Sequence, residues 1–103
     1  MAYKIVETQR AAQDLDHILR YLAVSLANPS AASAFADAIE ECYRNLEVMP
    51  LLYPLCRAAR LRRLGYRKAG IKNYIMIYKV REVDRSVQVL RFFHGKQAYE
   101  RLI

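Results

Sequence analysis

Apolar residues recur at steps of three and four along the first half of the chain, which predicts two helices with one buried face each. The first set is Ala11, Leu15, Ile18, Leu19, Leu22 and Leu26, and the second is Phe35, Ile39, Cys42, Tyr43 and Leu46. Thr8 is the expected N-cap of the first helix, and Asn28-Pro29 separates the two, because Asn caps well and Pro fits the first helical position. Pro50 ends the second helix. The connection is short, so we expect an antiparallel helical hairpin.

The period changes in the second half, where runs of β-branched and aromatic residues predict strands. We expect strands at 3–6, 64–68, 74–80 and 87–93, a loop over 51–60, a turn at 83–86 and a short helix at 96–102. The expected fold class is therefore α+β: an N-terminal strand, an antiparallel two-helix hairpin packed on one face of an antiparallel β-sheet, and a short C-terminal helix. We expect the other face of the sheet to be left open to the basic half of the chain.

Length and composition restrict the class of protein. A chain of 103 residues predicts one domain, 1–103, and an apolar content of 54% excludes a disordered tail. It contains no run of about eighteen apolar residues and no apolar N-terminal signal region, so we expect a cytoplasmic protein without a membrane partner. Two cysteines and two histidines lie far apart, which predicts reduced thiols, no metal site and no cofactor.

Charge is divided unequally between the two halves. Residues 1–50 carry four basic and seven acidic side chains, whereas residues 51–103 carry thirteen basic and three acidic ones. Seven basic residues fall between positions 57 and 72, and no acidic residue lies there: Arg57, Arg60, Arg62, Arg63, Arg67, Lys68 and Lys72. Such a field attracts polyanions, so nucleic acid or an acidic protein segment is the expected partner.

The ordered set of elements and residues resembles the RelE/ParE superfamily of bacterial toxins from type II toxin–antitoxin modules. The residues that carry the likeness run along nearly the whole chain: Ala11, Asp14-Leu15, Ile18, Tyr21-Leu22, Asn28-Pro29, Pro50, Tyr53-Pro54, Gly65-Tyr66-Arg67-Lys68, Asn73-Tyr74, Ile77-Tyr78, Val80, Val89-Leu90-Arg91 and His94-Gly95. No single motif is specific, but the ordered set is.

The resemblance implies a toxin that arrests growth, by one of two mechanisms. RelE-like members cut mRNA on the ribosome, and ParE-like members poison DNA gyrase. The long hairpin is similar to ParE, whereas the basic sheet and the end of the chain around His94 and Tyr99 are similar to the cleaving branch.

RelE-type enzymes carry an arginine directly after the tyrosine that opens the third strand, but here Ile75 follows Tyr74. His94 would take the role of that arginine, as a C-terminal histidine does in other ribosome-dependent members. We therefore expect ribosome-dependent mRNA cleavage by a metal-independent endoribonuclease, with gyrase inhibition as the alternative. An inert relative, or a module that only binds an antitoxin, is the third possibility.

Cleavage by attack of a ribose 2′-hydroxyl needs a base, cations that hold the phosphate, and an acid for the leaving oxygen. Arg67, Lys68 and Arg91 are the candidate cations, because guanidinium and ammonium groups bind phosphate. His94 is the candidate for proton transfer, since an unperturbed histidine titrates near neutral pH. Tyr99 is the candidate to stack on a base or act as the acid.

Each candidate also has a structural interpretation. The three cations suit a solvated strand face, His94 suits a strand end that bonds the backbone, and Tyr99 suits packing of the short helix on the sheet. A regular strand also points Arg91 and His94 to opposite faces. Both serve one site only if the strand twists or bulges near residues 93 and 94.

Both toxin mechanisms imply an antitoxin, which in this superfamily is small and has an acidic segment that orders on the toxin. We expect it to cover the stretch from Arg57 to Lys72 and the sheet, including Arg60, Arg62 and Arg63, which are the candidate residues for binding nucleic acid or antitoxin. Operator DNA would then be bound only through the antitoxin complex.

Overall fold

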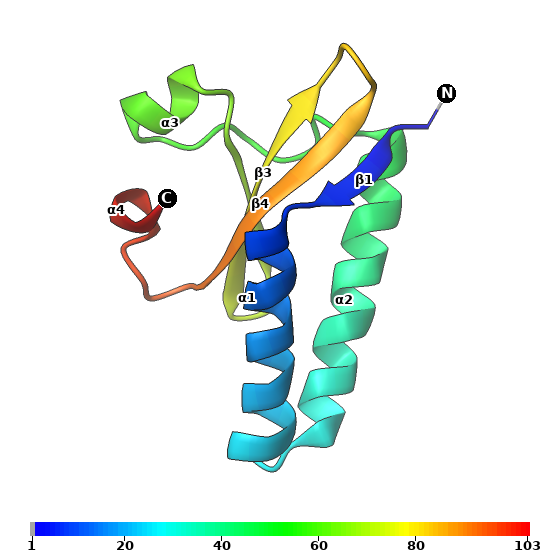
Figure 1. The fold of residues 1–103 in the computed structure, drawn as a ribbon, viewed down its shortest axis with the longest axis vertical. Helices are drawn as coiled ribbons and strands as arrows, with labels where there is room; N and C mark the ends of the chain where they lie inside the picture. The colour runs from blue at the N-terminus through cyan, green and yellow to red at the C-terminus, as the bar shows by residue number, and fades with distance from the viewer. Residues whose placement is uncertain (1) are drawn as a thin grey trace.

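The structure, a computed structural model, describes residues 2–103. Its elements follow the order β1 (Lys4–Glu7), α1 (Gln9–Arg20), the π-helical segment η1 (Tyr21–Ser25), α2 (Pro29–Val48), α3 (Ala59–Arg63), β2 (Arg67–Ile71), β3 (Tyr74–Arg81), β4 (Ser86–His94) and α4 (Tyr99–Leu102). Figure 1 shows the long hairpin of α1 and α2 extending beyond one end of the sheet. α3 and α4 lie on the left of the view, on the opposite side of the sheet from α2. The predicted α+β fold class is confirmed.

Local capping interactions set the bounds of the hairpin. The Thr8 hydroxyl accepts a hydrogen bond from the Ala11 N–H at 3.0 Å, and the Asn28 side chain accepts one from the Ala31 N–H at 3.1 Å. Each bond satisfies one of the free N–H groups at the start of its helix. Pro29 occupies the first turn of α2, as predicted. The buried face of α2 carries the predicted residues, which are Phe35, Ile39, Cys42 and Leu46.

The sheet has the strand order β1-β4-β3-β2 and is mixed rather than fully antiparallel. β2, β3 and β4 form antiparallel pairs, but β1 pairs with β4 in parallel, from Lys4 opposite Ser86 to Glu7 opposite Val89. Parallel neighbours need a long connection, and the hairpin supplies it by carrying the chain away from the sheet and back before the last three strands form. β1 ends opposite Val89, so among residues 2–103 no strand pairs with the second half of β4 on that side.

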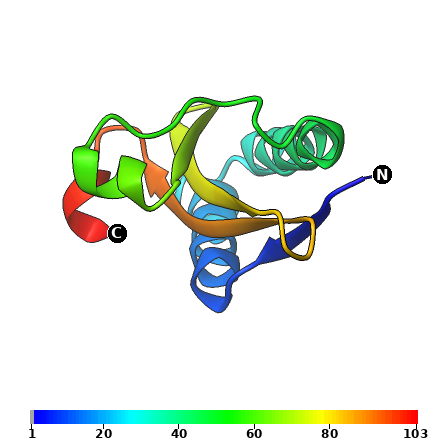
Figure 2. The same ribbon diagram turned by 90° about the horizontal axis from the view of Figure 1, so that it is seen from above.

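Both faces of the sheet are covered, which corrects the expectation of an open basic face. The hairpin covers one face and forms the main core with Ala69, Met76, Tyr78, Val87, Val89 and Phe92. A second cluster covers part of the opposite face and contains Cys56, Leu61, Ile75, Ile77, Phe93 and Tyr99. Figure 2 shows α3 and α4 on the side of the sheet away from α2. The basic residues therefore surround a small apolar core instead of lining a bare sheet.

The segment before β2 also differs from the prediction. Part of the expected loop over 51–60 is helical, because α3 begins at Ala59, and β2 begins at Arg67 rather than at residue 64. Leu61 is the only buried residue of α3, so this short helix has no apolar period that a sequence pattern would reveal. Gly65 follows it with φ of 79°, a left-handed conformation that glycine adopts without strain after a helix end. Within residues 2–103, no helix combines the length and apolar character needed to cross a membrane.

Candidate functional site

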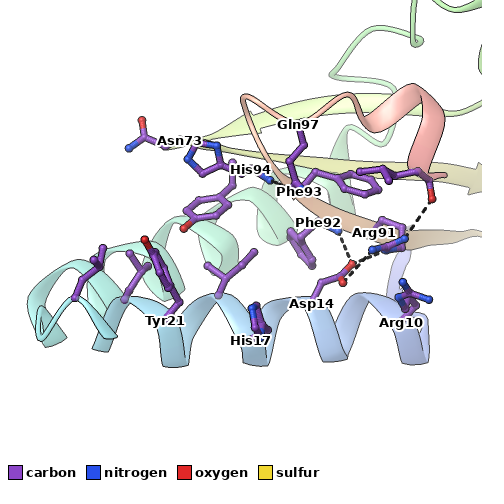
Figure 3. A pocket seen from close by; sticks show the side chains of 15 residues that line it. Arg10, Asp14, His17, Tyr21, Asn73, Arg91, Phe92, Phe93, His94 and Gln97 are labelled. Atoms are coloured by element: carbon purple, nitrogen blue, oxygen red, sulfur yellow. Dashed lines mark hydrogen bonds and ion pairs between the residues drawn. The ribbon is translucent and has the colours of Figure 1, made fainter. Parts of the chain in front are cut away.

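Arg91 of β4 is held by Asp14 of α1 and does not point freely into solvent. Its Nε donates to Asp14 Oδ2 at 2.7 Å and its Nη2 donates to Oδ1 at 3.3 Å, while the Phe92 N–H donates to Oδ2 at 3.0 Å. The two side chains are only 18% and 15% exposed. The guanidinium also lies 4.6 Å from the centre of the Phe93 ring. Figure 3 shows this ion pair between the helix and the strand. The charge of Arg91 is thus largely neutralised within the fold.

A β-bulge decides where Arg91 and its neighbours point. Tyr78 is opposite Val89 and Ile77 is opposite Arg91, so Leu90 is an extra residue in β4. An extra residue reverses the alternation of side chains; consequently Val89 and Phe92 both face the hairpin core. The bulge lies before Arg91 and not between Arg91 and His94, so these two side chains still leave opposite faces of the strand. Arg91 reaches Asp14 around the free edge of β4.

His94 ends β4 and lies half-buried against Tyr74. The two rings are perpendicular, with centres 5.4 Å apart, and the His94 Nδ1 accepts a hydrogen bond from the Lys96 N–H at 3.2 Å. A neutral imidazole whose Nδ1 accepts a hydrogen bond carries its proton on Nε2. In this arrangement the Nε2–H is a hydrogen-bond donor, which suits contact with an anion such as a phosphate oxygen.

Arg67 and Lys68 are neighbours in β2 and leave it on opposite faces. Arg67 is half-buried on the hairpin side, where its Nη1 donates to the Tyr53 carbonyl at 2.7 Å. Lys68 is exposed on the other side, and its Nζ lies 5.2 Å from the centre of the Tyr99 ring. The two cations therefore cannot hold one phosphate group together.

Tyr99 packs the short helix α4 onto the second core. It is 6% exposed, and its ring centre lies 6.3 Å from that of Phe93. Burial raises the pKa of its hydroxyl above the ordinary value for tyrosine. A buried tyrosine with a raised pKa holds its proton more tightly, and little of its ring is accessible for stacking on a base.

The basic stretch from Arg57 to Lys72 lies on the surface with carbonyl groups as its main partners. Arg60 donates to the carbonyls of Glu100 at 2.8 Å and Ile103 at 3.3 Å, so it holds the end of the chain against α3. Arg62 donates to the Cys56 carbonyl at 3.3 Å. Arg57, Arg63 and Lys72 are also exposed. Carbonyl partners orient a guanidinium without cancelling its charge, so this surface remains electropositive.

Two surface depressions bring together different parts of the predicted set. A pocket between α1 and the end of β4 contains Arg91 and His94, but Figure 3 shows them apart, with Phe92 and Phe93 between them. A shallow depression beside β2 contains Lys68, Lys72 and His94. It also contains Lys96, which sequence reasoning missed although it directly follows His94-Gly95. Arg67 lies in neither depression.

Asp14 is the other residue that sequence reasoning missed. It lies three residues after Ala11, within the apolar repeat of the first helix, and a carboxylate at such a position needs a partner on the element that the helix covers. Arg91 is that partner.

The two cysteines are free, as predicted, and both are buried. Burial raises the pKa of both thiols, which keeps them protonated and unreactive. Among residues 2–103, no group of three or more His, Cys, Asp or Glu side chains is placed to hold a metal ion.

Comparison with solved structures gives relatives with the same architecture. The toxin–antitoxin complex ParDE from Pseudomonas aeruginosa matches with a TM-score of 0.70 and 21% identity, over 92% of this chain and 98% of that one. The RelBE2 complex from Mycobacterium tuberculosis matches with a TM-score of 0.64 and 21% identity, over 91% and 99%. The RelE–RelB complex from Pyrococcus horikoshii matches with a TM-score of 0.64 and 17% identity, over 95% and 100%. At these identities the likeness establishes the fold.

Sequence comparison identifies the family. A search of curated proteins finds no significant match. The family described as ParE toxin of type II toxin–antitoxin system, parDE, matches residues 5–99. Because that match covers most of the chain and the fold agrees with it, this protein belongs to the ParE family of toxins from type II toxin–antitoxin systems.

Proposed function

We propose that this toxin arrests growth by binding and inhibiting DNA gyrase, without catalysing a reaction of its own. The observation that carries the proposal is the separation of the groups that RNA cleavage would need. Membership of the ParE family supports the same choice between the two mechanisms of the superfamily.

Cleavage requires a base, an acid and phosphate-binding cations within hydrogen-bond reach of one reacting group. Arg91 is neutralised by Asp14 at 2.7 Å, and Tyr99 is buried in the second core. The side chain of Arg67 points to the hairpin side of β2, whereas that of Lys68 points to the other side. His94 and Lys68 are the two candidates that remain accessible beside one another. A binder of gyrase needs only an exposed surface, which the basic stretch from Arg57 to Lys72 offers.

We also propose that an acidic antitoxin neutralises this toxin. The solved structures that match the fold are all complexes of a toxin with its antitoxin, which supports such a partner here. The uncompensated positive charge of the segment from residue 57 to 72 favours an acidic segment over it. Operator DNA would be reached through the antitoxin. A gyrase target places the action of the toxin in the cytoplasm.

Ribosome-dependent mRNA cleavage is the second candidate, and one observation favours it. His94 shares its depression with three lysines, namely Lys68, Lys72 and Lys96. Together they place an imidazole next to phosphate-binding cations. In this second mechanism the ribosome supplies the groups that are lacking from the depression.

The test uses the purified chain with gyrase and, separately, with programmed ribosomes. We expect inhibition of supercoiling by the wild type and by His94→Ala, weaker inhibition by Lys68→Ala, because Lys68 belongs to the basic stretch, and no cleavage of mRNA. Lys4→Ala is the matched control for loss of one exposed lysine, because Lys4 lies on β1 away from the depression. Site-specific mRNA cuts that disappear in His94→Ala but persist in Lys4→Ala would replace the gyrase proposal with the second candidate. Absence of both activities, together with normal growth on expression, would contradict both.

A further inference from the structure

Large apolar side chains gather on the surface at the end of α2 and along the segment that connects it to β2. Six of them are exposed between residues 48 and 64: Val48, Met49, Leu51, Leu52, Leu55 and Leu64. Leu51 is 61% exposed and Leu52 is 44% exposed, so neither is part of the core. A soluble surface rarely concentrates apolar groups in this way unless another molecule covers them.

Several of these side chains line one groove, which we call the leucine groove. It has a volume of about 680 Å³ and is lined by Met49, Leu51, Leu52, Leu55, Val80 and Arg67, among others. The groove therefore combines an apolar lining with a cation.

Arg67 gives the leucine groove a preference for acidic ligands. One guanidinium nitrogen is fixed by the Tyr53 carbonyl at 2.7 Å. Within residues 2–103, no carboxylate pairs with this arginine, since the acidic residue of the groove, Glu82, accepts instead from the Tyr3 hydroxyl at 2.9 Å. A half-buried guanidinium with free donors binds a carboxylate well. The chain also continues from Leu55 directly into the basic stretch that begins at Arg57.

We propose that the leucine groove is the anchor site for an acidic, amphipathic segment of the antitoxin, which places apolar side chains on Leu51, Leu52 and Leu55 and a carboxylate on Arg67. This inference rests on the proposed antitoxin partner and adds the place and chemistry of its attachment. Anchored here, the segment extends over the basic stretch and masks it.

Charge and polarity favour this occupant over others. A second copy of the chain would bring two electropositive surfaces together, which repel each other. Nucleic acid would satisfy Arg67 but would leave the leucines without apolar partners. An acidic amphipathic segment satisfies both features of the groove.

The experiment selects ligands from a phage-displayed library of random dodecapeptides on the immobilised full-length protein. We expect the selected peptides to combine aspartate or glutamate with large apolar residues. In amide chemical-shift mapping by NMR, a synthetic selected peptide should perturb residues of the groove. Leu52→Glu should weaken binding by about tenfold or more. Arg67→Gln is the second variant; it retains a donor for the Tyr53 carbonyl, and circular dichroism checks that both variants fold.

Val24→Glu is the matched control, because Val24 is 76% exposed but lies in η1, at the far end of the hairpin. It should bind the peptide as the wild type does. Peptides without acidic residues, peptides that map outside the groove, no selected binder, or dimerisation that Leu52→Glu abolishes would each overturn the inference. The gyrase assay separates this outcome from the proposed function. Loss of peptide binding with intact gyrase inhibition would refute only the proposed anchor site. Peptide binding without gyrase inhibition would refute only gyrase as the proposed target.

Discussion

Removing the Asp14 carboxylate should destabilise the fold far more than removing a carboxylate from the surface of the same helix. In Asp14→Ala, Arg91 keeps its charge at a site where its side chain is only 18% exposed, and the Phe92 N–H loses its acceptor. Breaking a buried ion pair by deleting one partner costs about 3–5 kcal/mol. Because this pair retains some exposure to solvent, we expect a loss near the lower end, about 3 kcal/mol.

Asp16→Ala is the matched control. Asp16 lies on α1 as well and pairs with Arg20 at 3.0 Å, but the two side chains are 64% and 78% exposed. Exposed pairs one helical turn apart contribute only about 0.3–0.5 kcal/mol. The two variants therefore remove the same chemical group from the same helix in different environments.

Equilibrium unfolding in urea, followed by circular dichroism, measures both changes. With an m-value of about 1.5 kcal/mol per molar, a loss of about 3 kcal/mol lowers the midpoint by about 2 M. The urea midpoint of Asp14→Asn should lie between those of Asp14→Ala and the wild type. The amide oxygen can still accept a hydrogen bond from the Phe92 N–H, but the negative charge is lost. If Asp14→Ala and Asp16→Ala shift the midpoint equally, the ion pair does not attach α1 to β4 as we infer.

Three further predictions concern buried groups. Burial raises the pKa of Tyr78 to about 12, whereas in the unfolded state it is about 10, so the unfolded state releases this proton first. The contribution of Tyr78 to the free energy of unfolding should therefore be complete below about pH 10 and decrease from about pH 10 to 12. Urea unfolding at several pH values should show a shallower decrease in Tyr78→Phe. Tyr99→Ala should lower the free energy of unfolding by about 3 kcal/mol or more, as measured by thermal unfolding, because it leaves a cavity in the second core. Leu102→Ala should lower it much less, because Leu102 is 51% exposed. Cys42 and Cys56 should react with a thiol reagent only slowly until urea unfolds the chain, and rapid labelling of the native protein would contradict their burial.

Several features of the candidate site were accessible from the sequence, and others were not. The basic character of residues 57–72 and the position of His94 at a strand end followed from composition and strand patterns. The bulge at Leu90 did not, because one extra residue in a strand leaves no mark in an alternating apolar run. Its effect on the site is large, since it reverses which side chains of β4 face the hairpin. Regular alternation would have placed Arg91 on the same face as Val89.

The covering of the second sheet face shows the same limit. Leu61 and Tyr99 each lie in a very short helix, and each is the one buried residue of its helix, so no repeat of apolar positions marks either helix. Their burial depends on meeting Phe93 and Ile75 across the sheet, which the spacing of residues along the chain does not encode.

What the sequence determined by itself is the hairpin and the order of the elements, because these depend on contacts between near neighbours. Thr8 caps α1 through a residue three positions away, and Asn28 caps α2 in the same way. Only the tertiary structure decided that β1 pairs in parallel with β4 and that Asp14 neutralises Arg91, 77 positions further along the chain. The physical reason is that a half-buried charge takes whichever partner the packed fold brings within reach, and that partner is set by the register and edges of the sheet rather than by local spacing.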